Sequence, residues 1–342
     1  MLTNFLTIIF IFLNPFAFLS SQANVDFGQK IDLEPKTSIA PNLLPTAASS
    51  LSNINLGLVD AISGLAISAV ASPNFLPIRN WNISQPEIEA EAALISMTGG
   101  KILYQKNIDN ILPIASLTKL MTGLIVLENI DLDQIVTVSK EAVAAYGDMG
   151  GLVIDEEISV RNLLYALLME SSNDAAITLA EAFGDASEGQ SFELVHLMNE
   201  KAKELGLTKT YFVEPTGYEP ANLSTALDLS KLVKYSLKQP LIWQILKTSV
   251  IDLSSANGLI NHHLTNTNQL LNYWPGIVGG KTGYTNEAQG CMILVIEQEL
   301  NKTKNYIGQP SSEYLIIIVL GAQERFSETV KLIDWAKEAY IW

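Results

Sequence analysis

Apolar runs of strand length occur near both ends of the region from residue 86 to residue 342. Ala92–Met97 and Lys101–Gln105 are two short runs joined by a Thr-Gly-Gly turn, the composition of a β-hairpin. Gly276–Glu297 shows the pattern of a strand, a polar turn and a second strand, and Tyr314–Leu320 is rich in Ile and Val. These patterns predict a mostly antiparallel sheet whose strands come from the two ends of this region.

The stretch between these strands, roughly residues 116–247, has helical periodicity. Val160–Met169 is an apolar helix for which Ser159 is the expected N-cap, and Asp174–Phe183 is a second helix. A further amphipathic helix is predicted from about residue 327 to residue 340. Strands at both ends that enclose helices define an α+β domain, with a mostly antiparallel β-sheet, flanking helices and a helical insert.

The first 23 residues predict export. Phe5–Leu19 is almost wholly apolar, charged side chains begin only at Asp26, and Ser21-Gln22-Ala23 supplies small residues at a spacing suited to a signal peptidase. Residues 1–23 are therefore either a cleaved signal peptide or a retained N-terminal anchor, since about 20 apolar residues span a bilayer. Both alternatives place the rest of the chain outside the cytoplasm, either secreted or attached to the membrane through its N-terminus.

Residues 24–85 differ in composition from the rest of the chain. They are rich in Ser, Ala and Asn, contain few charges and are interrupted by prolines, among them Pro41, Pro45 and Pro73. This composition predicts a low-complexity linker, to which we assign no function. The globular domain is then expected to cover residues 86–342.

Composition excludes several classes of function. The 342 residues carry a net charge of −15, which argues against a nucleic-acid partner because phosphate binding needs clustered Lys and Arg. A single cysteine, Cys291, excludes an intrachain disulfide and a cysteine-based metal cluster. The zinc-protease pattern His-Glu-x-x-His and the esterase pattern Gly-x-Ser-x-Gly are both missing from the sequence. We therefore expect no metal and no cofactor.

Ser116 and Lys119 open an apolar helix. The eight residues Leu120–Leu127 carry no charge, so a lysine at this place is unexpected, because desolvating an ammonium is costly without a partner. Burial lowers the pKa of lysines in general, and a residue three positions after a serine can reach its hydroxyl on the same helix face. The pair is therefore a candidate nucleophile and base. A lysine that extends from the helix start into solvent is the alternative.

Two further polar motifs follow along the chain. Ser171-Ser172-Asn173 lies between the two predicted helices, where a hydroxyl and an amide can point into a shared cleft; helix capping is the alternative. Lys281-Thr282-Gly283 begins an apolar strand, where its lysine and threonine can hold a carboxylate and its glycine permits the close approach of a peptide; a plain hairpin turn is the alternative. A similar Ser-x-Asn pattern at residues 255–257 lacks strongly periodic helices on either side.

Ser-x-x-Lys, Ser-x-Asn and Lys-Thr-Gly, in this order, resemble the signature of penicillin-recognising serine enzymes. The surrounding residues are similar to those of the D-alanyl-D-alanine carboxypeptidase family, over Ala115–Thr122, Ser171–Ala176, Ser224–Leu229 and Lys281–Ala288. The resemblance covers about residues 88–342. It implies a penicillin-binding or β-lactamase-like transpeptidase fold, and a serine-type carboxypeptidase that trims the peptide stems of peptidoglycan in cell-wall synthesis.

The resemblance also implies the roles of four catalytic residues. Ser116 attacks the carbonyl between two terminal D-alanines and forms an acyl-enzyme, which water then hydrolyses. Lys119 is the base toward Ser116. Ser171 relays a proton to the leaving amine, and Asn173 orients the substrate amide or Lys119.

Substrate binding is implied for the third motif and its neighbours. Lys281, Thr282 and Gly283 hold the terminal carboxylate and the peptide, and the backbone N–H groups of Ser116 and Tyr284 form the oxyanion hole. Arg325 is a further candidate for a carboxylate contact, with a surface arginine as the alternative. The implied partners are stem peptides ending in D-Ala-D-Ala, and β-lactam antibiotics as covalent inhibitors.

The sequence also departs from the family pattern. Many relatives carry a second, β-rich domain and a C-terminal anchor, whereas this sequence stops at Trp342, so any membrane attachment is expected at the N-terminus. Shortened relatives include enzymes that cut peptide crosslinks, which makes a D,D-endopeptidase the first alternative. A β-lactamase needs a carboxylate that activates water, and Glu219–Asn222 is one residue short of the usual Glu-x-x-x-Asn spacing. A non-catalytic penicillin sensor is the remaining alternative.

Overall fold

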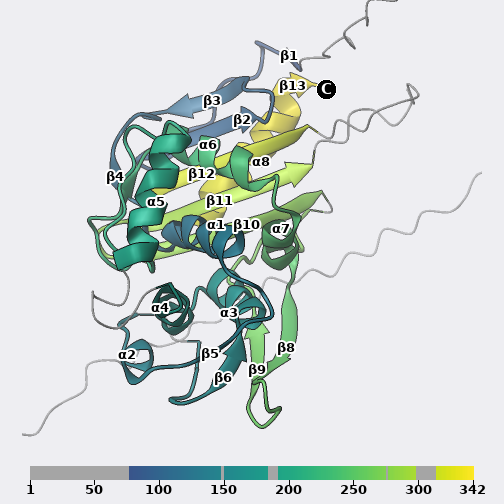
Figure 1. Cartoon of the computed structure of the whole chain (residues 1–342). Coiled ribbons are helices and arrows are strands. Elements are labelled where there is room, and N and C mark those ends of the chain that lie inside the picture. Colours follow the sequence, from purple (N-terminus) through teal and green to yellow (C-terminus); the bar gives the residue numbers. More distant parts are fainter. Residues whose placement is uncertain (1–76, 148–149, 184–191, 275, 298–312) are drawn as a thin grey trace, which may run out of the picture. The chain divides into compact units, whose positions relative to one another are not determined.

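The computed structural model describes residues 77–147, 150–183, 192–274, 276–297 and 313–342. The largest element is a five-stranded antiparallel sheet with the strand order β10-β11-β12-β2-β3 (Figure 1). The strands are, in chain order, β2 (Ala92–Met97), β3 (Ile102–Lys106), β10 (Ile277–Thr285), β11 (Gln289–Glu297) and β12 (Tyr314–Ala322). The sheet therefore joins strands from the two ends of the domain, as the hydrophobic pattern predicts.

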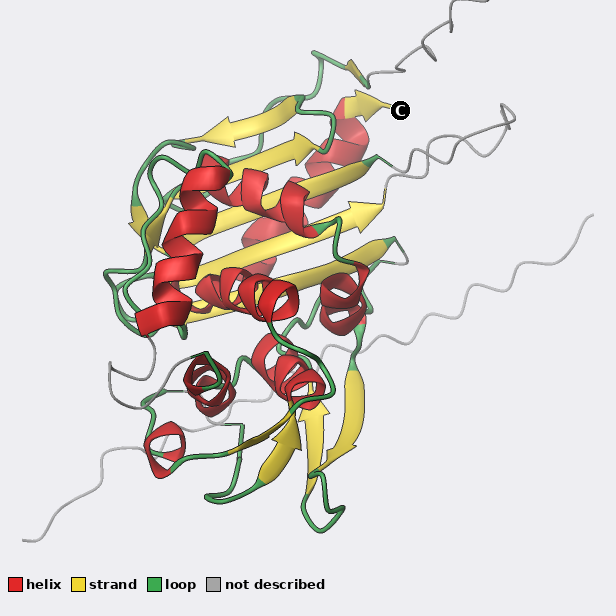
Figure 2. Ribbon diagram, in the orientation of Figure 1, coloured by secondary structure: helices red, strands yellow, loops and turns green. Residues whose placement is uncertain are grey.

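Both faces of this sheet are buried because its strands are apolar at successive positions. Along β11, Ile293 and Val295 belong to one hydrophobic cluster, whereas Leu294 and Ile296 belong to another. Neighbouring side chains of a strand point to opposite faces, so the two clusters are the cores on the two sides of the sheet. Helices cover both faces and complete a three-layer arrangement (Figure 2).

One face of the sheet is covered by α8 (Arg325–Ala339), which packs on β11 and β12. After α8 the chain forms β13 (Tyr340–Ile341), which pairs with β1 (Ile78–Arg79). Within α8, Trp335 Nε1 donates to Ser84 O at 2.7 Å. The last element of the domain is thereby fixed against its first residues.

The opposite face is covered by the helical insert. Every residue of α1 from Thr118 to Val126 is buried, which is expected of a helix that is apolar on all sides and lies inside a core. α1 is the helix that follows Ser116, so the nucleophile candidate precedes a helix whose first nine residues are buried. The helices on this face are α1 (Thr118–Asn129), α5 (Phe192–Glu204), α6 (Ala226–Ser236) and α7 (Pro240–Lys247).

The rest of the insert forms a smaller group of short elements next to this layer (Figure 1). Two-stranded ribbons β5–β6 and β8–β9 lie here together with α2, α3 and α4. A further ribbon, β4–β7, pairs the residues just before Ser116 with Leu223 and Ser224. The bounds are β4 (Leu112–Pro113), β5 (Ile135–Thr137), α2 (Lys140–Val143), β6 (Glu157–Ser159), α3 (Val160–Tyr165), α4 (Asn173–Glu181), β7 (Leu223–Ser224), β8 (Val250–Ser254) and β9 (Asn261–Thr265).

The predicted α+β class is confirmed, with local differences in the insert. The helix predicted over Val160–Met169 is divided into α3 and a π-helical turn, Ala166–Glu170, although Ser159 does cap it by accepting from Asn162 N at 3.2 Å. The hairpin β8–β9 was not expected. β8 alternates exposed and half-buried residues and β9 alternates exposed and buried ones, with several polar side chains, so both lack the apolar run that marks the main strands.

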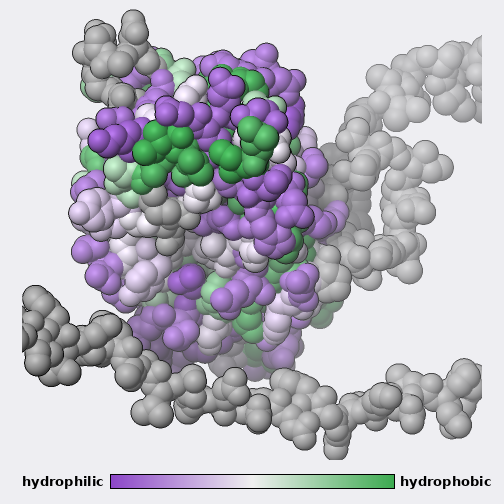
Figure 3. Space-filling model, turned by 90° about the horizontal axis from the view of Figure 1, so that it is seen from below, coloured by the Kyte–Doolittle hydropathy of each residue, from purple (hydrophilic) through white to green (hydrophobic). Residues whose placement is uncertain are grey.

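Residues 1–76, which hold the predicted signal or anchor and most of the predicted linker, lie outside the described residues. Within the described part of the chain, no helix combines the length and apolar character that a bilayer crossing needs. Viewed from below, the surface is largely hydrophilic, with hydrophobic side chains gathered in separate areas (Figure 3). Trp81 and Leu259, which are 86% and 81% exposed, are among the most exposed large hydrophobic residues of the described surface.

Cys291 lies within the sheet, and burial raises the pKa of its thiol to about 11. Because the thiolate is the reactive form, we expect the folded protein to react with a maleimide at neutral pH at least ~100-fold more slowly than the unfolded protein. Intact-protein mass spectrometry with and without guanidinium measures both rates. Fast, complete labelling of the folded protein would contradict the buried position of β11.

Candidate active site

Ser116 lies in a tight turn immediately before α1. The turn is the 3₁₀-helix η1 (Ala115–Leu117), and α1 begins only at Thr118, later than the sequence pattern suggested. Ala115 has a positive φ of 46°, a conformation that costs energy for a residue with a side chain. Leu117 is fully buried, whereas Ser116 is half-buried. The turn therefore anchors its apolar members in the core and leaves the serine hydroxyl at the surface of a cleft.

Two glycines allow other segments to approach this turn closely. Gly217 has a φ of 84°, and a Cβ atom added there would lie 2.0 Å from Ala115 O. A Cβ added to Gly283 on β10 would lie 3.0 Å from Ser116 N. Any larger residue at these positions would displace the backbone that carries the serine, so the turn is held between β10 and the loop that contains Gly217.

Lys119 is fully buried in the first turn of α1 and directs its ammonium toward Ser116. Its Nζ lies 3.1 Å from Ser116 Oγ, and it donates to Asn173 Oδ1 and to Thr216 O at 2.6 Å each. Hydrogen bonds of this kind offset part of the cost of removing an ammonium from water. The alternative in which Lys119 extends into solvent is therefore wrong.

The second motif lies where the π-helical turn meets α4. Ser171 adopts the left-handed conformation with a φ of 69°, which ends the π-helical turn, and its hydroxyl accepts from Lys281 Nζ. Ser172 caps α4 by accepting from Ala175 N at 2.9 Å. Asn173 then binds Lys119 through Oδ1 and donates through Nδ2 to Tyr146 O. The sequence left helix capping and cleft formation as alternatives for this motif. Both occur: Ser172 caps the helix, and Asn173 lines the cleft.

Lys281 is the second buried lysine of the site, with 1% of its surface exposed. Its Nζ donates to Ser171 Oγ at 2.9 Å and to Thr282 O at 2.9 Å. Thr282 in turn shares a hydrogen bond of 2.6 Å with the hydroxyl of Thr267. Lys281 thus connects the edge strand β10 to the Ser171 turn, as Lys119 connects α1 to Asn173.

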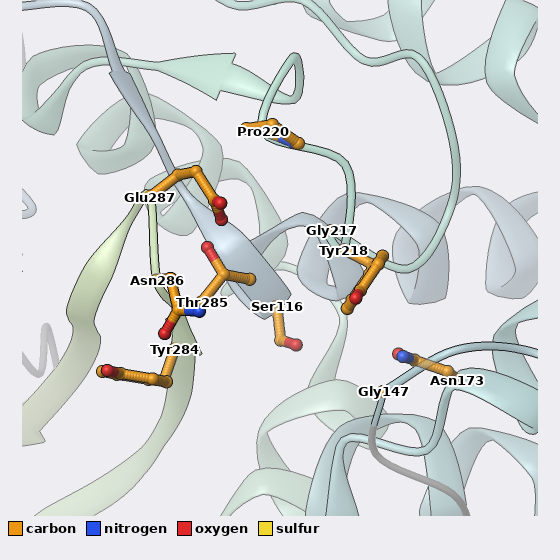
Figure 4. A pocket seen from close by; sticks show the side chains of 10 residues that line it. All are labelled: Ser116, Gly147, Asn173, Gly217, Tyr218, Pro220, Tyr284, Thr285, Asn286 and Glu287. Carbon is orange, nitrogen blue, oxygen red and sulfur yellow. The ribbon is translucent and has the colours of Figure 1, made fainter.

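A cleft of about 290 Å³ opens above Ser116 (Figure 4). Tyr146 and Tyr218 stack with ring centroids 6.1 Å apart, and both are exposed. The cleft is bounded by β10 and its turn on one side and by the loop with Gly217 and Tyr218 on the other. The residues that line it are Ser116, Gly147, Asn173, Gly217, Tyr218, Pro220, Tyr284, Thr285, Asn286 and Glu287.

The structure brings most of the predicted site residues together. Hydrogen bonds link Ser116, Lys119 and Asn173 in one group, and Lys281, Ser171 and Thr282 in another. Gly283 contacts the serine turn, and Tyr284 lines the cleft.

Arg325 is the exception among the predicted residues. It begins α8, its guanidinium stacks on the ring of Phe326 with 4.8 Å to the centroid, and its stem lies close to Gly290. Arg325 does not belong to the lining of the described cleft. Its predicted contact with a substrate carboxylate stays a prediction.

Sequence reasoning missed several groups that complete the site. The main-chain carbonyl groups of Thr216 and Tyr146 accept hydrogen bonds from Lys119 and Asn173, respectively. Every residue has such a carbonyl, so the sequence does not show which ones take part in the site. The hydroxyl of Thr267 comes from the loop after β9. Among the described residues, no group of three or more His, Cys, Asp or Glu side chains is placed to hold a metal ion.

Residues 80–304 match the model of a protein family described as D-alanyl-D-alanine carboxypeptidase. The chain belongs to this family. The match spans the serine turn, the Ser-x-Asn turn and the Lys-Thr-Gly strand. It confirms the family resemblance and the enzyme class, a serine-type D-alanyl-D-alanine hydrolase, that the three motifs imply.

Individual relatives agree with this assignment. D-alanyl-D-alanine carboxypeptidase DacF of Bacillus subtilis is 34% identical over 81% of this chain and 69% of its own length. A D-alanyl-D-alanine endopeptidase of Pseudomonas aeruginosa is 30% identical over 84% of this chain and 89% of its own length. The crystal structure of the Streptomyces K15 DD-transpeptidase superposes with a TM-score of 0.67, at 29% identity, over 74% of this chain and 98% of that one. The predicted transpeptidase fold is confirmed.

Replacing Lys119 with Arg tests the base. An arginine stays protonated, so it cannot accept the proton of Ser116, and we expect labelling by a fluorescent penicillin to slow by about 100-fold or more. The labelling reaction is stopped at successive times and read by in-gel fluorescence to give the rate, and circular dichroism checks the fold. Lys140→Arg, an exposed change on α2, is the matched control. Labelling of a folded Lys119→Arg variant within a few-fold of wild type would exclude Lys119 as the base.

Proposed function

We propose that this protein is a D-Ala-D-Ala carboxypeptidase that trims the peptide stems of peptidoglycan through an acyl-enzyme on Ser116. The observation that carries the proposal is the 3.1 Å separation between Ser116 Oγ and the fully buried Nζ of Lys119. A lysine at this distance, in its neutral form, can take the hydroxyl proton as the oxygen attacks a carbonyl carbon.

The proposed reaction has two halves. The Ser116 oxygen adds to the carbonyl carbon of the penultimate D-alanine while its proton moves to Lys119 Nζ. The C–N bond then breaks, the leaving amine takes the proton from Lys119 through Ser171, and the terminal D-alanine departs. A water molecule next adds to the ester carbonyl and gives one proton to Lys119. The C–O bond to Ser116 then breaks, and Ser116 Oγ takes this proton to regenerate the hydroxyl.

The geometry supports one orientation of the substrate. β10 is an edge strand of the sheet, so an extended peptide can pair with it. Lys281 and Thr282 precede Gly283 on this strand and are proposed to receive the terminal carboxylate, while the acyl side runs past Tyr284 toward the turn after β10. The N–H groups of Ser116 and Tyr284 are the proposed donors to the carbonyl oxygen, consistent with the close approach of Gly283 to the serine turn.

The cellular setting is proposed from the substrate class and the sequence. Peptidoglycan is assembled outside the cytoplasm, and the family to which the chain belongs acts on it, so we place the enzyme on the extracytoplasmic side. Residues 1–23 would direct its export, as a cleaved signal or as an anchor. If they are retained as an anchor, the part of the predicted linker that precedes β1 would separate the catalytic domain from the membrane. β-Lactam antibiotics are proposed as covalent inhibitors, because they present an acyl group to the same serine.

A second candidate activity is the cleavage of peptide crosslinks. Two of the relatives, from Pseudomonas aeruginosa and Escherichia coli, are named D-alanyl-D-alanine endopeptidases, and the chain covers 89% and 80% of their lengths. The chemistry at Ser116 is the same in both activities. They differ in the leaving group, which is free D-alanine in one case and the side-chain amine of a neighbouring stem in the other.

The structure gives a β-lactamase little support. Glu219, the residue that loosely matches a water-activating carboxylate, is exposed and does not line the described cleft. The side chain of Asn222 makes its hydrogen bonds with Val213 and Glu214, not with Glu219. Glu219 and Asn222 therefore resemble the β-lactamase motif in their sequence spacing but do not contact each other through their side chains.

The products of wild-type protein distinguish the two activities. Protein from residue 24 onward is incubated with a pentapeptide ending in D-Ala-D-Ala and, separately, with a crosslinked muropeptide, and the products are identified by mass spectrometry. We expect loss of one alanine from the pentapeptide, and no activity and no penicillin labelling for Ser116→Ala. Cleavage of the crosslinked substrate alone would favour the endopeptidase. Labelling of a folded Ser116→Ala variant would remove Ser116 as the nucleophile.

The lifetime of a penicilloyl adduct tests the β-lactamase alternative. Since Glu219 lies outside the cleft lining, we expect the adduct to persist after a penicillin pulse and Glu219→Gln to leave its decay unchanged within about twofold. Intact-protein mass spectrometry over time follows the decay. Rapid loss of the adduct in wild type that Glu219→Gln abolishes would establish a β-lactamase instead.

A further inference from the structure

The carboxylate of Glu214 collects N–H groups from the loop that faces Lys119. Oε2 accepts from Thr216 N at 2.6 Å, and Oε1 accepts from Gly217 N at 2.6 Å. Oε1 also accepts from Asn222 Nδ2, while Asn222 Oδ1 accepts from Val213 N at 2.7 Å. Asn222 is fully buried, so this network determines the path of the loop from residue 213 to residue 222.

One peptide unit of this loop joins Glu214 to the proposed base. The peptide between Thr216 and Gly217 donates its N–H to Glu214 and accepts with its carbonyl from Lys119 Nζ at 2.6 Å. The N–H and C=O of a trans peptide lie in one plane and point in opposite directions, so Glu214 and Lys119 bind opposite edges of the same amide. A carboxylate at the N–H polarises the amide and increases the negative charge on its oxygen, which strengthens the hydrogen bond to an ammonium.

The same peptide also fixes the turn of the nucleophile. Gly217 packs so closely on the serine turn that an added Cβ would lie 2.4 Å from Ala115 C and 2.9 Å from Ser116 N. A small rotation of this peptide would therefore disturb both the carbonyl that binds Lys119 and the backbone that carries Ser116.

We propose that Glu214 is a positioning residue for the reaction at Ser116. It holds the Thr216–Gly217 peptide so that the carbonyl faces Lys119, and through this peptide it stabilises Lys119 when that residue carries the proton of Ser116. Glu214 is half-buried and does not line the described cleft, so it acts through the peptide without contact with the substrate. This inference rests on the proposed acylation of Ser116 and adds a residue to it.

The decisive variant is Glu214→Gln, which keeps the shape of the side chain. The glutamine oxygen can still accept from Gly217 and Asn222, but its NH₂ group faces the N–H of Thr216, and the negative charge is lost. We expect the rate constant for acylation by penicillin to fall by about 10- to 100-fold. The acidic limb of its pH profile should also move to lower pH, because the ammonium form of Lys119 loses stabilisation.

Two controls separate this role from loop stability and from overall charge. Glu219→Gln removes the same charge from the same loop at an exposed position, and it should leave rate and pH profile unchanged. Thr122→Val removes another anchor of the loop, the hydrogen bond from Thr122 Oγ1 to Pro215 O at 2.7 Å. It should lower the melting temperature without moving the acidic limb.

The outcomes separate this inference from the proposed function. If wild-type protein is not acylated at Ser116, both fail together. If wild type is acylated and a folded Glu214→Gln variant reacts within about twofold of it with an unmoved limb, the positioning role alone is overturned. An equal shift of the limb in Thr122→Val would overturn it as well. Should Glu214→Gln not fold, Glu214→Asp withdraws the carboxylate by one methylene, and an unchanged rate in that variant would overturn the role.

Discussion

The burial of the Lys119 ammonium is the constraint on which the rest of this site depends. Desolvating a cation inside an apolar helix is unfavourable by several kcal/mol unless polar atoms surround it. The acceptors come from separate parts of the chain: the η1 turn, the start of α4 and the loop that carries Thr216. Because each acceptor is supplied by a different segment, the lysine is stable only when these segments are packed together. The geometry that makes Lys119 a candidate base is the same geometry that makes its burial tolerable.

Lys281 repeats this arrangement between β10 and the Ser171 turn. A fully buried lysine and a nearly fully buried one direct their ammonium groups toward one small region, although the whole chain carries a net charge of −15. Net charge therefore says little about the cleft, where local placement determines which ligands are attracted. The two lysines do not themselves line the described cleft; they bind Ser116, Asn173 and Ser171, and the first two of these do line it. The exposed carboxylate of Glu287 also lines this cleft.

The sequence predicted those features that depend on side-chain type and local period. The main strands and α8 follow from apolar runs, and Ser116, Lys119 and Lys281 follow from motif spacing. The left-handed Ser171 and the π-helical turn before it could not be predicted, because they result from packing around the turn. The bond between Glu214 and Asn222 is equally invisible in the sequence, where Glu219 stands closer to that asparagine. Main-chain acceptors such as Thr216 O carry no residue signature at all.

The order of strands in the sheet has a consequence for how the protein becomes active. β2 near the start of the domain pairs with β12 near its end, and in the sequence the whole helical insert separates these two strands. Contacts between such distant segments form late and slowly, because a long loop must close before they contribute. The segment with Ser116 is synthesised long before the strand with Lys281 that faces it. A nascent chain thus carries the serine without its surroundings until β10, which carries Lys281 and Gly283, packs against the serine turn.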